Sequence, residues 1–129
     1  ILIKISPDLN DDDIKKIVDM ALDLNIDGII TSNTTISRSN LKSKKKLRRE
    51  IGGLSGKPLT IRSTEIIKLI HEYSNKKLPI IGVGGIMSTQ DALDKLNAGA
   101  SLIQLYTGFI YNGPSFARNI NKEIIKSLN

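Results

Sequence analysis

The stretch Pro79-Ile80-Ile81-Gly82-Val83-Gly84-Gly85-Ile86 decides the fold of this chain. Its apolar run from Pro79 to Val83 is too short for a helix and rich in β-branched residues, which predicts a buried strand. The run breaks at Gly84-Gly85, and Ser88 with Asp91 three residues later has the spacing of a helix capping box. A strand that turns through glycines into a helix exposes main-chain N–H groups, which favours phosphate binding. A tight turn that binds no ligand is an equally good interpretation of the glycine pair alone.

Size and composition indicate one small domain with an aliphatic core. The chain has 129 residues, of which 40% are hydrophobic but only 4% aromatic. It contains no cysteine, which excludes a disulfide framework and a cysteine-based metal site. No apolar run has the length of a membrane span, and we find no signal peptide. Because Ile1–Ile5 has the pattern of the middle of a strand, we expect the chain to be a piece of a longer protein.

The net charge of +6 is concentrated in one segment, residues 38–50. This basic loop holds seven lysines and arginines against Glu50, and the rest of the chain carries 12 basic and 12 acidic residues. Binding of nucleic acid through such a segment normally adds stacking aromatic residues, and the loop has none. We therefore expect a solvated surface loop and no nucleic-acid partner.

Apolar strands alternate with amphipathic helices four times along the chain. The strands are expected at residues 1–6, 28–31, 79–83 and 101–105, each followed by a helical pattern. For the second helix we expect Ser63 or Thr64 as the N-cap and Tyr73 on the buried side, after an irregular segment at residues 52–59. This βα repetition predicts an α/β fold with a parallel sheet.

Two architectures are compatible with four parallel βα units: an open doubly wound sheet and a (β/α)₈ barrel. The first strand is followed by Ser6-Pro7-Asp8, which lacks the glycine fingerprint of a dinucleotide-binding sheet. Polar residues and glycines follow every strand, which favours half of a barrel with its site at the carboxyl ends of the strands. The turns at Gly84-Gly85 and Tyr106-Thr107-Gly108 would then belong to the seventh and eighth units, where barrels commonly bind phosphate.

Candidate site residues cluster after the strands. Lys4 is the one charged residue inside an apolar strand, so it either meets an anionic or electron-rich ligand or faces water at a sheet edge. The polar run Ser32-Asn33-Thr34 offers hydrogen-bond donors and acceptors, although these residues also suit an ordinary turn. Ser55-Gly56 allows the main chain to approach a ligand closely. Thr107-Gly108 would add a hydroxyl and a main-chain donor for a phosphate.

Five ordered motifs together resemble the C-terminal half of a dihydroorotate dehydrogenase. They are Lys4-Ile5-Ser6-Pro7-Asp8-Leu9, Ser32-Asn33-Thr34-Thr35, Gly52-Gly53-Leu54-Ser55-Gly56-Lys57-Pro58-Leu59, Gly82-Val83-Gly84-Gly85-Ile86 and Gln104-Leu105-Tyr106-Thr107-Gly108. The forms of the third and fifth motifs resemble the class 2, quinone-dependent enzymes. The resemblance covers nearly the whole chain, residues 1–129, and is weakest in the basic loop.

The resemblance implies an FMN-binding barrel that oxidises dihydroorotate to orotate in pyrimidine biosynthesis and passes the electrons to a quinone. Lys4 would contact the flavin ring, where a positive charge favours the reduced cofactor. Asn33 and Thr34 would bind the substrate. The remaining cofactor-binding residues implied by the resemblance are Ser32, Ser55, Gly56, Gly84, Gly85, Tyr106 and Thr107.

The resemblance also implies parts that this chain does not supply. The family's catalytic base is a serine in the N-terminal half of the barrel, and we assign it to no residue here. The membrane-binding region, through which the parent protein would lie peripherally on a bacterial or mitochondrial inner membrane, precedes the matched region. We therefore expect the isolated chain to show no turnover, to bind FMN weakly and to aggregate, pair with itself or remain partly unfolded.

Two other functions stay open at this point. Another phosphate-binding barrel enzyme is possible because the glycine turns serve many chemistries on this fold. A basic nucleic-acid-binding module carried by residues 42–49 is the third interpretation, and a steep salt dependence of binding would favour it.

Overall fold

A computed structural model describes residues 1–39 and 41–127 and contains one four-stranded parallel sheet. The strands lie side by side in chain order. They are β1 (Leu2–Ile5), β2 (Gly28–Thr31), β3 (Ile80–Val83) and β4 (Leu102–Gln104). The predicted α/β fold with four parallel βα units is confirmed, because a helical segment follows every strand.

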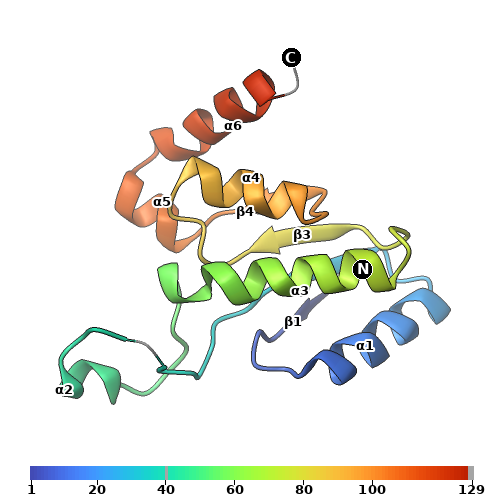
Figure 1. Cartoon of the computed structure of the whole chain (residues 1–129), viewed down its shortest axis with the longest axis horizontal. Helices are drawn as coiled ribbons and strands as arrows, with labels where there is room; N and C mark the ends of the chain where they lie inside the picture. Colours follow the sequence, from blue (N-terminus) through green and yellow to red (C-terminus); the bar gives the residue numbers. More distant parts are fainter. Residues whose placement is uncertain (40, 128–129) are drawn as a thin grey trace.

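Apart from α2, the helices pack on one another or on the sheet (Figure 1). They are α1 (Asp11–Asp23), α2 (Lys45–Arg48), the 3₁₀ turn η1 (Lys57–Leu59), α3 (Thr60–Tyr73), α4 (Thr89–Asn97), α5 (Thr107–Asn112) and α6 (Ser115–Ser127). The central helix is α3, which contacts β2, β3, α1 and α4. Among the described residues, no helix combines the length and the apolar character needed to cross a bilayer.

The two faces of the sheet are covered unequally. Alternate strand residues point to opposite faces, and Ile5, Ile29 and Ile80 on one face are buried in the main core. They pack against residues of α1 and α3, among them Ile14, Val18, Ala21, Ile66, Ile67 and Ile70. On the other face, Leu2 is 46% exposed and Leu102 is 62% exposed. The sheet thus has a helix-covered face and an open face, and Lys4 and Gln104 lie on the open one.

Side chains cap the first turns of α1 and α4, and the second of these caps is the capping box predicted at Ser88 and Asp91. The side chain of Asn10 accepts a hydrogen bond from the Asp13 main-chain N–H at 2.8 Å and caps α1. The side chain of Ser88 caps α4, and the Asp91 carboxylate accepts from the Ser88 main-chain N–H at 2.8 Å. This capping box fixes where the chain enters α4 after the glycine turn.

The expected start of the second helix is wrong by four or five residues, because the N-cap of α3 is Leu59. Helix α3 begins at Thr60, directly after the turn η1, which has Pro58 in its first positions. Because Pro58 presets a helical φ angle, the segment expected to be irregular ends in a helical turn. Ser63 lies inside the helix and is fully buried, whereas Tyr73, expected to be buried, is 41% exposed.

The basic loop, residues 38–50, contains one short helix, α2, which stands apart from the sheet (Figure 1). The loop prediction therefore misses this single helical turn. The Arg38 guanidinium donates hydrogen bonds to the carbonyl oxygens of Thr35 at 3.1 Å and Glu50 at 3.3 Å, which joins the two ends of the segment. Asn40 lies outside the described residues.

Candidate functional site

An open cavity of about 230 Å³ lies at the carboxyl ends of the four strands. The cavity contains every residue predicted for the site, namely Lys4, Ser32, Asn33, Thr34, Ser55, Gly56, Gly84, Gly85, Tyr106 and Thr107. The structure thus brings the ten residues together, although they come from segments up to about a hundred residues apart in the sequence.

The turn after β3 is shaped by two glycines with positive φ, +103° at Gly84 and +71° at Gly85. A Cβ atom on Gly85 would overlap the main-chain N and Cα of Thr60, so only glycine fits there. The carbonyl oxygen of Gly84 accepts from the Ser63 hydroxyl at 2.9 Å, and that of Gly85 accepts from the Thr60 hydroxyl at 2.5 Å. Since C=O and N–H of a trans peptide point in opposite directions, the N–H groups of Gly85 and Ile86 point away from α3.

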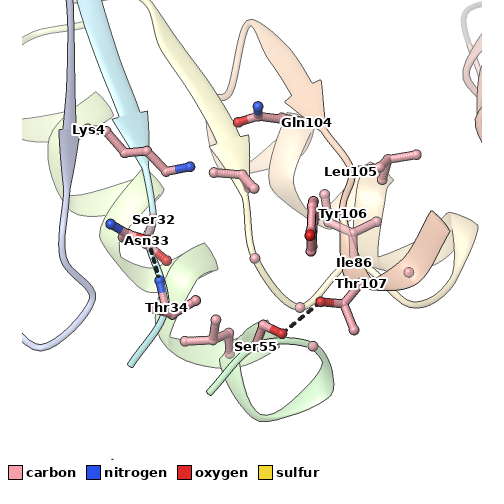
Figure 2. A pocket seen from close by; sticks show the side chains of 16 residues that line it. Lys4, Ser32, Asn33, Thr34, Ser55, Ile86, Gln104, Leu105, Tyr106 and Thr107 are labelled. Atoms are coloured by element: carbon pink, nitrogen blue, oxygen red, sulfur yellow. Dashed lines mark hydrogen bonds between the residues drawn. The ribbon is translucent and has the colours of Figure 1, made fainter. Parts of the chain in front are cut away.

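A second turn, Tyr106–Gly108, closes against the first. A Cβ on Gly108 would overlap the carbonyl oxygen of Ile86, so α5 packs directly on the turn after β3. The sequence predicted a loop here, but Thr107 already begins α5. The Thr107 hydroxyl donates a hydrogen bond to the Ser55 hydroxyl oxygen at 2.8 Å (Figure 2). This bond joins the β4 end of the cavity to the segment before α3.

Lys4 is the one charged residue among the described residues that line the cavity. Figure 2 shows its side chain extending from β1 toward the centre of the cavity, above Ser32 and Asn33. The side chain is exposed, so the ammonium group keeps its hydration until a ligand enters. Its charge would attract an anionic or electron-rich group to this end of the cavity.

Two polar side chains at the end of β2 differ in how they are satisfied. The Asn33 side-chain oxygen accepts from the Thr34 main-chain N–H at 2.9 Å. Ser32 lines the cavity but is only 3% exposed, and its hydroxyl, like that of the fully buried Thr31, has no hydrogen-bond partner among the described residues. An unpaired buried hydroxyl costs about 1–3 kcal/mol, and a ligand atom in the cavity would remove that cost.

Two residues were not singled out by the sequence analysis, Gln104, which lines the cavity, and Lys95, which lies behind it. Gln104 lies on the open face at the end of β4 and lines the cavity opposite Lys4 (Figure 2). A polar residue inside an apolar strand is the same signal that singled out Lys4. Lys95 lies on the buried side of α4 behind the glycine turn. The sequence offered no signal for it, because a lysine on a helix is ordinarily exposed.

Comparison with known proteins places this arrangement in a family. Residues 1–128 match the family profile described as dihydroorotate dehydrogenase. The chain belongs to the dihydroorotate dehydrogenase family. The family predicted from the five motifs is therefore confirmed.

The chain spans about a third of the length of the relatives described next. It is 56% identical over 126 residues to a protein of Christiangramia forsetii named dihydroorotate dehydrogenase (quinone), covering 98% of this chain and 36% of the relative. It is 45% identical to the mitochondrial dihydroorotate dehydrogenase (quinone) of Arabidopsis thaliana, covering 99% of this chain and 28% of the relative. The solved dihydroorotate dehydrogenase of Eimeria tenella in complex with ferulenol superposes with a TM-score of 0.92 at 41% identity, covering 99% of this chain and 34% of that one. The predicted part-barrel fold agrees with this match.

Proposed function

We propose that residues 1–129 form the C-terminal half of an FMN-binding (β/α)₈ barrel. The complete enzyme would oxidise dihydroorotate to orotate in pyrimidine biosynthesis and pass the electrons to a quinone. One observation carries this proposal: the strand ends converge on a cavity with a single cation, two glycine turns and an unpartnered buried hydroxyl. Family membership over nearly the whole chain supports it.

The glycine turns fit the phosphate end of FMN. The N–H groups of Gly85 and Ile86 point away from α3, and Gly84 presents no side chain toward the cavity. Thr107 adds a hydroxyl beside the turn after β3, and Tyr106 precedes it. Main-chain N–H groups in a glycine turn are suitable ligands for phosphate oxygens.

The remaining cofactor contacts fit a planar ring and its linker. The Ser32 hydroxyl, which lacks a partner, would gain one from the ligand. Ser55 and Gly56 line the same wall, where the positive φ of Gly56, +81°, lets the main chain approach closely. Lys4 would place its charge beside the flavin ring. FMN, when bound, supplies the hydride acceptor for the reaction.

The substrate would lie above the flavin near Asn33 and Thr34. Asn33 carries both a donor and an acceptor, which suits the amide groups of a pyrimidine ring. These residues would hold the substrate in position for hydride transfer to the flavin. We assign the catalytic base to a serine in the N-terminal half, outside this chain. That half would also carry the quinone site and the peripheral contact with a bacterial or mitochondrial inner membrane.

Replacing Lys4 tests this function in the complete enzyme, meaning the full-length polypeptide that carries these residues. We expect Lys4→Ala to bleach or shift the visible flavin spectrum and to lower dihydroorotate oxidation at least about a hundredfold, as for a missing electrostatic group in an active site. Lys68→Ala, on the exposed side of α3, is the matched control and should change neither. An unchanged spectrum in Lys4→Ala would contradict the proposed role.

Replacing Asn33 separates substrate binding from cofactor binding. Asn33→Ala should raise the KM for dihydroorotate about tenfold or more, because one or two hydrogen bonds to the substrate are lost. The flavin content and spectrum should stay as in the unmodified enzyme. Loss of FMN together with turnover would place Asn33 in the cofactor site instead.

A further inference from the structure

Lys95 is a fully buried lysine on α4 whose hydrogen-bond partners are all uncharged. Its ammonium group donates to the hydroxyl oxygens of Ser63 at 2.6 Å and Thr64 at 3.0 Å, and it lies 3.5 Å from the carbonyl oxygen of Thr60. A buried lysine is costly, and an apolar residue of similar size would normally be more stable. The first turn of α3 accepts all three bonds. We therefore look there for a role that explains why this position holds a charged residue.

The contact with Lys95 fixes what the Ser63 hydroxyl can do. An ammonium group has no acceptor, so Ser63 must accept from it and must turn its own hydrogen elsewhere. The carbonyl oxygens within reach of the hydroxyl are those of Leu59 at 2.7 Å, Gly84 at 2.9 Å and Thr60 at 3.3 Å. A charged Lys95 thus keeps Ser63 in the role of donor toward these carbonyl groups.

The same turn of α3 holds both carbonyl oxygens of the glycine turn. Thr60 donates to Gly85, and the one hydrogen of the Ser63 hydroxyl is shared between the carbonyl oxygens of Gly84 and Leu59. These bonds orient the two peptide planes and so direct the N–H groups of Gly85 and Ile86 away from α3. Lys95 contacts both donor residues, Ser63 through its hydroxyl and Thr60 through its carbonyl oxygen. The ammonium group therefore lies one hydrogen bond behind the turn that faces the cavity.

We propose that Lys95 is a positioning residue for phosphate recognition: through Ser63 and Thr60 it orients the Gly84-Gly85 turn toward the phosphate of the bound ligand. This proposal rests on the proposed function, in which that phosphate belongs to FMN. Lys95 touches neither the cavity nor its contents. Its effect should accordingly be confined to the phosphate end of the ligand and leave binding of the ring unchanged.

Because Lys95 can lose its proton, its proposed effect on the Gly84-Gly85 turn should depend on pH. Burial lowers the pKa of Lys95 from 10.5 to about 8, while the charges of Asp91 and Asp94 on α4 oppose this shift. The facing side of α3 carries the Ser63 and Thr64 hydroxyls, with Glu65 and Lys68 farther out along a shallow groove. A neutral Lys95 has a lone pair that can accept from Ser63. The hydroxyl can then turn away from Gly84 as the pH rises through about 8.

The decisive experiment compares FMN with riboflavin, which has the same ring but no phosphate. Affinities are measured by flavin fluorescence in the flavin-free complete enzyme. We expect Lys95→Met to weaken FMN binding about tenfold, the effect of losing one well-placed hydrogen-bond contribution, and to leave riboflavin binding within about twofold. Lys68→Met, an exposed lysine on the neighbouring helix, is the control and should change neither affinity. Ser63→Ala should lose part of the same preference, and adding Lys95→Met to it should weaken FMN binding less than Lys95→Met does in the unmodified enzyme.

Three results would overturn the proposal. Parallel losses of FMN and riboflavin affinity in Lys95→Met would indicate general damage to the fold. Unchanged FMN affinity in this variant would show that the contact between Lys95 and Ser63 does not affect phosphate binding. If Lys95→Met does not fold, the unmodified enzyme still provides the test, because its preference for FMN over riboflavin should fall about tenfold between pH 7 and 9.5. A flat preference over this range would contradict the proposal. Absence of FMN binding by the unmodified enzyme would instead refute the proposed function itself.

Discussion

The two sides of the Gly84-Gly85 turn treat polar groups in opposite ways. On the cavity side, Ser32 has a buried hydroxyl without a partner, and Lys4 is exposed with its ammonium directed into open space. On the helix side, Ser63 and Lys95 are fully buried, and their polar atoms are hydrogen-bonded. Unsatisfied groups beside a cavity indicate where a ligand binds, whereas satisfied groups behind it indicate what supports the site.

This difference explains how a short turn of small residues can be both open and rigid. The turn contributes almost no side chain of its own, so its conformation must come from α3 and α4. The buried hydrogen bonds of Thr60 and Ser63 supply that support. The cavity side can then leave its donors unpaired at a cost that ligand binding recovers. Substitutions on the two sides should consequently change FMN affinity and protein stability in different ways.

The largest effect is expected at the turn itself. Gly85→Ala places a methyl group against the main chain of Thr60 at a φ of +71°, so the turn must shift and the hydrogen bonds on both sides are lost. We expect FMN affinity to fall more than about a hundredfold and stability by about 3 kcal/mol or more. Gly113→Ala is the control, because it has a similar φ of +77° but open space around it. Equal effects at the two glycines would show that the φ angle alone matters.

The next largest effect concerns the helix side and its dependence on pH. The pKa of Lys95 is about 8 in the folded chain and 10.5 in the unfolded chain, since burial disfavours the charged form. Between these values the unfolded state binds more protons, so the free energy of unfolding rises with pH across this window. Compared with Lys95→Met, the unmodified enzyme should gain at most about 3 kcal/mol in its free energy of unfolding by pH 10.5. Urea unfolding at pH 7 and 10 measures this gain, and a constant difference between the two proteins would contradict it.

On the cavity side we expect a smaller effect, in which stability increases while FMN binding weakens. Ser32→Ala removes the unpartnered hydroxyl, so the flavin-free enzyme should become more stable by about 1 kcal/mol. The same change should weaken FMN binding several-fold, because the ligand loses a hydrogen-bond partner. Thermal unfolding with and without FMN measures both. A loss of stability without ligand would mean that the hydroxyl is satisfied within the protein.

The smallest effect is expected for the exposed bond between Ser55 and Thr107. The two hydroxyl groups are 2.8 Å apart but exposed, so water replaces the bond readily. Ser55→Ala should change the free energy of unfolding by no more than about 0.5 kcal/mol. A loss above about 2 kcal/mol would show that this contact supports the cavity as strongly as the helix side does.

The sequence predicts most of the cavity side and little of the helix side. Glycines, short polar residues and one lysine inside a strand stand out against apolar strands, so Gly84, Asn33 and Lys4 could be found from local patterns. The supporting contacts could not, because Ser63 resembles an N-cap and Lys95 resembles a surface residue in any local window. Their roles depend on how α3 and α4 pack, which is a property of the tertiary structure. The start of α3 is misplaced for a local reason instead, because Pro58 already begins a helical turn before Ser63.

Titration of the flavin-free complete enzyme with FMN tests the central claim most directly. If the four strand ends form the cofactor site, FMN fluorescence should be quenched to saturation at one FMN per chain, and Gly85→Ala should abolish this quenching. Absence of saturable quenching, or unchanged quenching in Gly85→Ala, would contradict the account.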